Sequence, residues 1–148
     1  MAHKYDFHFQ GVAPADLTGF KFFTRGFSRT VAVRGINKLI NVWTKLFLTS
    51  KGSDPTDIDR GTTFPALIGS NITDAQGLRD VVLLAIADCN AQLQVLQRQS
   101  IPDLDETLRS ATLTQFGQLT PDGIQVYIGI TNMKDEQASI LLPLLIEA

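Results

Sequence analysis

The hydrophobic period changes from that of helices to that of strands near residue 111, and this change constrains the fold more than any other feature. From Val31 to Ser50, apolar residues recur three or four positions apart, as in an amphipathic helix. We take Ser28 as the candidate N-cap for this helix. Its opposite face carries polar and basic residues: Arg34, Lys38, Asn41 and Lys45.

A second, longer helix is predicted to begin at a capping box, with Thr73 as the N-cap and Gln76 three residues later, and to run to about Arg98. Cys89 lies in its apolar stripe and is interpreted as a buried, unreactive thiol. We expect other parts of the chain to cover this helix on more than one side. The residues that widen the stripe are Val81, Leu83, Leu84 and Ile86.

After Ala111 the apolar residues alternate, which indicates strands with one buried face. The sequence Thr120-Pro121-Asp122-Gly123 favours a hairpin turn, with the glycine at positive φ, and a second turn is expected at 132–136. The last segment, Ala138 to Ile146, contains Pro143, which has no N–H and is typical of an edge strand. The expected fold is therefore α+β: two main helices packed on a three-stranded antiparallel meander with an exposed edge strand.

Length and composition exclude several classes of protein. The chain of 148 residues corresponds to one domain, and its apolar runs are too short for a membrane span. The first ten residues do not have the layout of a signal peptide, so we expect an intracellularly made, soluble protein. One cysteine and two histidines provide neither a disulfide framework nor a zinc set, and we expect no cofactor and no metal.

Charge is unevenly distributed along the chain. Residues 1–51 contain eight lysines and arginines against two aspartates, whereas the remainder has five basic against thirteen acidic residues. A basic segment with interspersed phenylalanines is compatible with nucleic-acid binding, but the overall pI of about 5.6 and the lack of a binding motif argue against it. A solvated basic face whose partner is the acidic half of the same molecule is a second explanation. The third, head-to-tail assembly in which a basic patch meets an acidic patch on a neighbour, is favoured over nucleic-acid binding.

Residues 1–26 form a phenylalanine-rich N-terminal arm ahead of the domain at 27–148. An arm of this length cannot build its own core, so its rings must either pack back on the domain or insert into another chain. The rings considered for partner binding are Phe20, Phe22 and Phe23.

No catalytic motif is present in the sequence. There is no phosphate-binding glycine loop, nucleophile elbow or metalloprotease motif. Asp105 and Glu106 could suggest paired carboxylates, but they are interpreted as solvent-facing residues of a polar turn beside Arg109. The aspartates of residues 54–59 do not fit an EF-hand loop, because its glycine and glutamate positions hold Asp59 and Pro65. We therefore expect no enzymatic activity.

The order of Phe27-Ser28-Arg29-Thr30, a basic amphipathic helix and the segment from Thr49 to Gly61 resembles the baseplate wedge proteins that initiate sheath assembly in contractile phage tails. That family, historically labelled lysozyme-like, is related to a type VI secretion baseplate subunit. Its loop follows the pattern T-x-K/R-G-S-x-P-x-D-P-x-F-G. The chain departs from it at Ile58 and Arg60, and has Asn90-Ala91-Gln92 where many members carry a docking Glu-Pro-Arg turn.

The resemblance implies a structural virion protein of the tail baseplate, assembled in the host cytoplasm. It would form a ring of about six copies around the tube, contact wedge, tube or hub proteins, and nucleate the sheath. An exposed edge strand would accept a strand from the sheath protein by β-strand augmentation, with pockets lined by Ile140, Leu142 and Leu144. Arg34, Lys38, Lys45, Asn90 and Gln92 are further candidate contacts. A peptidoglycan hydrolase and a nucleic-acid-binding module remain the alternatives.

Overall fold

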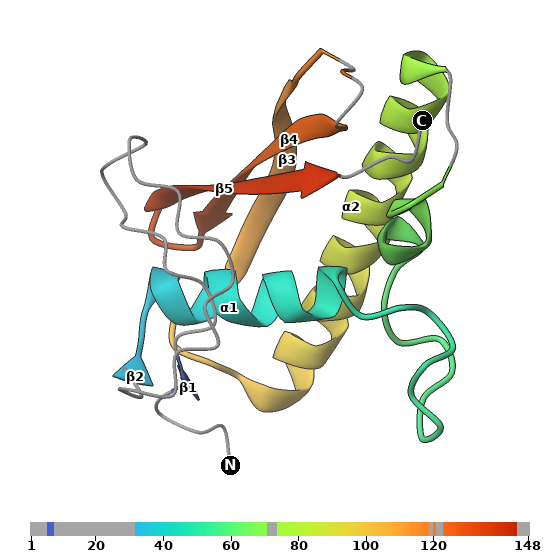
Figure 1. Cartoon of the computed structure of the whole chain (residues 1–148). Helices are drawn as coiled ribbons and strands as arrows, with labels where there is room; N and C mark the ends of the chain where they lie inside the picture. The colour runs from blue at the N-terminus through green and yellow to red at the C-terminus, as the bar shows by residue number, and fades with distance from the viewer. Residues whose placement is uncertain (1–5, 8–31, 71–73, 119, 121–122, 145–148) are drawn as a thin grey trace.

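The computed structural model describes residues 6–7, 32–70, 74–118, 120 and 123–144. Within these ranges, two α-helices pack against a three-stranded antiparallel sheet, so the predicted α+β class is confirmed (Figure 1). Phe20, Phe22 and Phe23 lie outside the described residues. The helices and the sheet strands, in chain order, are α1 (Ile36–Phe47), α2 (Ala75–Ser100), β3 (Leu108–Phe116), β4 (Ile124–Asn132) and β5 (Gln137–Leu144).

Helix α1 begins at Ile36, later than the hydrophobic period predicts. Gly35 is its N-cap and has φ of 63°, a left-handed conformation that interrupts the helix and that glycine adopts without strain. Just upstream, β2 (Ala32–Val33) pairs antiparallel with β1 (Asp6–Phe7). The predicted helix start at Val31 is therefore wrong, and Ser28, which lies outside the described residues, is not the N-cap.

Helix α2 begins one residue later than predicted, because Asp74 is its N-cap instead of Thr73. The Asp74 carboxylate accepts hydrogen bonds from the backbone N–H groups of Gln76 and Gly77, at 3.0 and 3.1 Å. Gln76 does not reach back as in a capping box; its amide donates to Asp80 one turn ahead. The helix ends at Ser100, close to the predicted end.

The sheet has the order β3-β4-β5, as expected for a meander, so the Pro143-containing strand β5 lies at an edge as predicted. Gly123 closes the first hairpin with φ of 126°, and Thr120 exchanges backbone hydrogen bonds with it. The second turn is built on buried Asn132, whose side-chain oxygen accepts from the backbone N–H groups of Lys134 and Glu136. Both turns predicted from the sequence are confirmed.

The core lies between the helices and one face of the sheet. Helix α1 packs on β4 and β5, whereas α2 packs on β3 and on α1 (Figure 1). Trp43 of α1 stacks on Phe47, with ring centroids 4.7 Å apart, and Phe47 contacts Phe64 of η1 (Phe64–Leu67). Within the described part of the chain, no helix is both long and apolar enough to cross a membrane.

One face of α2 is not covered as predicted. Ile86 is buried, but Leu84 and Val95 are 70% and 53% exposed, and Leu83 is also exposed. The apolar stripe of this helix is therefore wider than the part of its surface that the described fold buries. An apolar surface remains on the outer side of α2.

Candidate partner-binding surfaces

The outer edge of β5 presents backbone groups that no described residue uses. In the turn before β5, the N–H of Asn132 donates to the carbonyl of Glu136, and the β4–β5 register continues from there without a shift. Along an antiparallel ladder, pairs of residues that are hydrogen-bonded to each other alternate with pairs that are not. Since Glu136 belongs to a bonded pair, the even-numbered residues of β5 are the ones that bond to β4. The N–H and C=O groups of Ser139 and Leu141, and the C=O of Pro143, therefore point away from the sheet.

Pro143 fits this edge for the same reason. Pro143 is one of the odd-numbered residues whose backbone groups point away from β4, so the N–H that proline lacks would not have bonded to β4. Proline at this position therefore removes no bond from the β4–β5 ladder. The strand keeps its pairing with β4 and presents only an acceptor at its outer C-terminal end.

The side chains of Ile140, Leu142 and Leu144 face the core, where they are at most 2% exposed. Our prediction that they line pockets for an inserted strand needs correction, because side chains of even-numbered residues pack against the helices. Ser139 and Pro143 are exposed, and Leu141 is half-buried, on the opposite face of the sheet. Any partner strand would therefore meet the backbone of β5 and the side chains of these three odd-numbered residues.

The opposite edge of the sheet, along β3, is partly closed by two amide side chains of α2. Asn90 donates to the carbonyl of Ala111 at 2.9 Å, and the Gln97 side-chain oxygen accepts from the N–H of Leu108 at 2.9 Å. Asn90 also accepts from the indole N–H of Trp43 at 2.8 Å. Asn90, a candidate for docking, thus links α1, α2 and the sheet within the chain.

Sequence reasoning missed the role of Gln97. The signal was available: Asn90 and Gln97 are two amides seven residues apart, on the same flank of the apolar stripe of α2. Such a pair at helical spacing indicates that the helix lies along exposed backbone groups. Since two side chains of α2 cap β3 and none of the described residues caps β5, the two edges of the sheet differ in their capacity to accept another strand.

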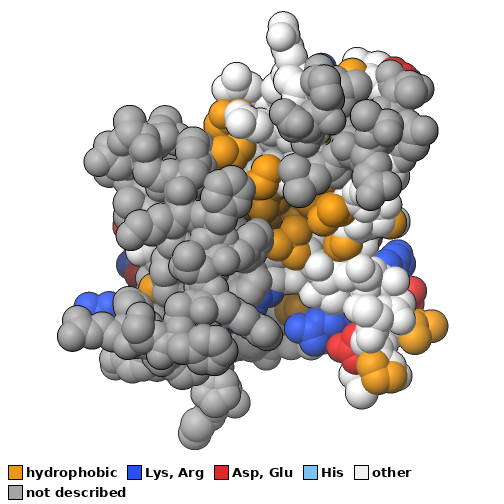
Figure 2. All heavy atoms as spheres, viewed as in Figure 1, with side chains coloured by type: hydrophobic (Ala, Val, Ile, Leu, Met, Phe, Trp, Pro, Cys, Tyr) orange, Lys and Arg blue, Asp and Glu red, His pale blue; other side chains and the backbone are white. Residues whose placement is uncertain are grey.

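Hydrophobic side chains reach the surface beside the β5 edge, although none of the large hydrophobic residues of α1 and β5 is exposed. Figure 2 shows them between the end of β5 and helix α1. A strand added along β5 would lie next to this apolar surface. Apolar contact would therefore add to backbone pairing at this edge.

The segment from Thr49 to Thr62 is a loop closed tightly at its neck. The N–H of Thr62 donates to the carbonyl of Thr49 at 2.8 Å. The side-chain oxygen of Gln92 accepts from the N–H of Gly61 at 3.0 Å, and its side-chain nitrogen donates to the carbonyl of Gly61 at 2.8 Å. Gly61 has φ of 101°, and a Cβ there would lie 2.3 Å from the carbonyl oxygen of Thr49. Gln92, predicted as a docking residue, thus fixes this loop to α2.

The tip of the same loop projects from the body of the molecule (Figure 1). The Asp54 carboxylate accepts hydrogen bonds from the hydroxyl and the N–H of Thr56, and the guanidinium of Arg60 lies 3.5 Å from the same carboxylate. These contacts, the hydroxyl bond first, lower the pKa of Asp54 below its usual value. Ile58 at the tip is 68% exposed, so an ordered loop carries an apolar side chain into solvent.

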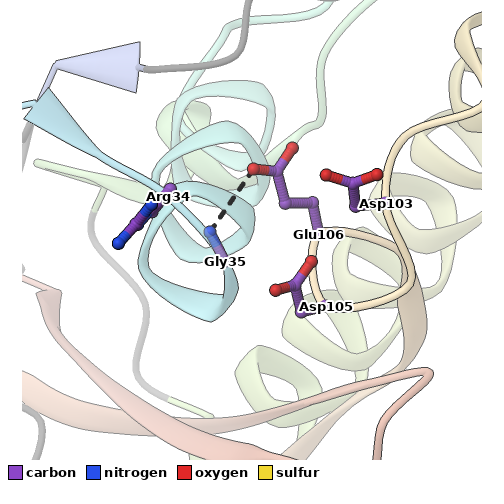
Figure 3. A pocket seen from close by; sticks show the side chains of 5 residues that line it. All are labelled: Arg34, Gly35, Asp103, Asp105 and Glu106. Carbon is purple, nitrogen blue, oxygen red and sulfur yellow. Dashed lines mark hydrogen bonds between the residues drawn. The ribbon is translucent and has the colours of Figure 1, made fainter.

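A hollow of about 380 Å³ is lined by Arg34, Gly35, Asp103, Asp105 and Glu106 (Figure 3). Our prediction that Glu106 faces solvent is wrong: its side chain is 10% exposed and lies 2.7 Å from the ammonium of Lys38. It also accepts from the N–H of Gly35, at the start of α1. Arg109 pairs with Asp135 instead of with these acids. Glu106 thus joins the α2–β3 connection to α1.

The basic residues predicted as one contact surface occupy different environments. Arg34 is exposed before α1 and lines the acidic hollow, and Lys45 is exposed in the last turn of α1. Lys38 is largely buried in its ion pair with Glu106, and Asn41, on the same predicted polar face, is buried. The face that the sequence presents as uniformly polar is therefore partly internal.

Among the described residues, no group of three or more histidine, cysteine, aspartate or glutamate side chains could hold a metal ion. Cys89 is buried in the core, and its thiol lies 3.6 Å from the carbonyl of Trp43. Burial raises the pKa of Cys89, with a smaller contribution from Asp88. The prediction of a buried thiol is confirmed.

Comparisons with known protein families, curated proteins and solved structures find no significant match to this chain. The resemblance of the Thr49–Gly61 loop to the sheath-initiator family therefore stays a prediction from the sequence.

Proposed function

We propose that this protein is a structural, non-enzymatic component of a contractile phage tail baseplate, where it nucleates the sheath by β-strand augmentation. The observation that carries the proposal is the outer edge of β5, whose row of backbone groups no described residue uses. A strand donated by a sheath subunit would gain main-chain hydrogen bonds there. Figure 1 shows β5 at the near side of the sheet.

Two further features support the same proposal. The ordered loop from Thr49 to Thr62 carries the pattern that resembles the sheath-initiator family, and its neck is fixed by Gln92. The excess of basic residues in the first third of the chain, against acidic residues in the rest, suits repeated contacts between unlike surfaces in a ring. Wedge and tube or hub proteins are the partners proposed for these surfaces.

A binding experiment can separate backbone pairing at β5 from other modes of contact. Ser139→Pro removes one outward N–H without touching the β4–β5 ladder, whereas Ser139→Ala keeps that N–H and serves as the matched control. We expect a purified sheath subunit of the same virus to bind the alanine variant normally and the proline variant at least about tenfold more weakly. Equal binding of the two variants would overturn the β5 mechanism.

The location of the protein is tested separately by cryo-electron microscopy of purified particles. We expect density for this fold at the baseplate, around the tube and beneath the first sheath ring. Particles that lack the protein, or purified protein that clears a suspension of peptidoglycan, would contradict a structural role in the tail. Salt-dependent DNA binding lost on Arg34→Ala would instead favour the nucleic-acid alternative.

A further inference from the structure

The outward face of α2 carries an apolar stripe that the described fold leaves in solvent. Leu84 is 70% and Val95 is 53% exposed, although both lie well inside a 26-residue helix. Residues spaced by three, four or seven positions share a helix face, so the stripe is continuous along this part of the helix. Its members, all exposed, are Leu83, Leu84, Ala87, Ala91 and Val95.

Charges of opposite sign stand at the two ends of this stripe. Asp80 lies four residues before Leu84, and Arg98 lies three residues after Val95; both side chains are exposed. Asp80 accepts a hydrogen bond from Gln76, and no ion pair joins Asp80 or Arg98 to any residue in the part of the chain that the structure describes. The stripe is therefore polarised, acidic at its start and basic at its end.

Apart from Leu84, whose counterpart is Gln94, the arrangement along the sequence is symmetric about Cys89. Asp80 and Arg98 are each nine positions from it, Leu83 and Val95 are each six, and Ala87 and Ala91 are each two. If a second copy of α2 lay antiparallel on this face, each Asp80 would meet the other copy's Arg98. The two alanine pairs would cross at the centre, where small side chains let helices approach closely.

We propose that a second copy of this chain covers the stripe, so that the protein forms an antiparallel two-fold dimer through α2. The charge pattern favours a second copy as the partner of the stripe. An antiparallel copy places Asp80 against Arg98 at both ends and Ala87 against Ala91 at the centre. One helix stripe buries less surface than the roughly 800 Å² per partner of a standard interface. The dimer is therefore weak, with a dissociation constant between about 10 µM and 1 mM.

This proposal does not depend on the tail function. A dimer through α2 leaves the β5 edge accessible, since the stripe faces away from the sheet on which α2 packs. Failure of one proposal therefore leaves the other standing. The dimer is a state of the free protein, before any assembly.

Charge reversal with mixing tests the geometry directly by sedimentation equilibrium of the full chain between about 10 µM and 1 mM. Asp80→Arg alone opposes two arginines at each end, and Arg98→Asp alone opposes two aspartates. Each variant is expected to dimerise at least about tenfold more weakly than the parent. In a heterodimer of the two variants, both arginines of one chain face aspartates of the other, so an unlike pair returns at both ends. Heterodimers should therefore form with nearly the parental affinity.

Leu84→Gln, at an exposed position, should weaken the dimer to a similar extent without affecting folding, which circular dichroism checks. A parent protein that stays monomeric throughout the concentration range would overturn the proposal. So would a dimer that is indifferent to the single charge reversals, or a mixture that forms no heterodimer. A dimer with those last properties would use another face of the molecule.

Discussion

Gly61 shows how one residue position fixes the shape of the projecting loop. Its φ of 101° and the 2.3 Å separation that a Cβ would have from the Thr49 carbonyl oxygen allow no side chain, whereas Gly52 has φ of 83° with nothing within 4 Å. Both glycines look alike in the sequence. Only the contact with Thr49 distinguishes a position that must be glycine from one that merely prefers it.

Gly61→Ala should therefore cost about 2–4 kcal/mol of unfolding free energy, because backbone strain adds to a clash with backbone atoms. Gly52→Ala, the matched control, should cost only about 1 kcal/mol, the strain of a left-handed alanine. Urea denaturation of the two variants measures the difference. Equal losses would show that the neck of the loop yields easily.

Cys89 gives a prediction about pH. Since burial raises the pKa of the folded-state thiol, the folded protein keeps the neutral form. Its contribution to stability is complete below the unfolded-state pKa of about 8.5 and falls as the pH rises above it, by up to about 1.4 kcal/mol per pH unit. The unfolding free energy of the parent should fall more steeply above that pH than that of Cys89→Ala. If the unfolding free energies of the two proteins fell in parallel with pH, the Cys89 thiol would not be the cause of the loss.

At the scale of elements, the strands of the sheet were the most predictable part of this chain. Alternation of Ile124, Val126, Ile128 and Ile130 and the turn glycine at Gly123 place β4 and its hairpin correctly. The start of α1 was not predictable from periodicity, because Val33 continues the helical spacing while Gly35 breaks the helix. The role of Glu106 depends on Lys38, 68 residues away, so local pattern could not reveal it.

Proline substitutions at two adjacent positions test which backbone N–H groups of β5 bond to β4 and which point outward. Ala138→Pro removes an N–H that bonds to β4 and should cost about 3 kcal/mol or more. Ser139→Pro removes an outward N–H and should cost about 1 kcal/mol or less, as Pro143 in the same outward row suggests. Thermal or urea unfolding compares the two. A larger loss for Ser139→Pro would reverse the assignment of the rows.

At the scale of the whole molecule, a strand edge at β5 and an apolar helix face on α2 have no partner among the described residues. The sequence showed both, since Pro143 marked the edge and Leu84 widened the stripe of α2. It misassigned their use, because the large side chains of β5 turned out to be core and the wide stripe turned out to be exposed. Periodicity identifies faces; only the packed structure shows which face is inside.

Amide exchange of β5, followed by NMR in free protein and with a sheath subunit, tests the central claim most directly. In the free protein, the N–H of Leu142 should already be protected by β4, whereas those of Ser139 and Leu141 should exchange rapidly. Binding should slow exchange at Ser139 and Leu141 by about a hundredfold or more, as new main-chain bonds form. Binding that leaves these two amides exchanging as before would contradict strand addition at β5.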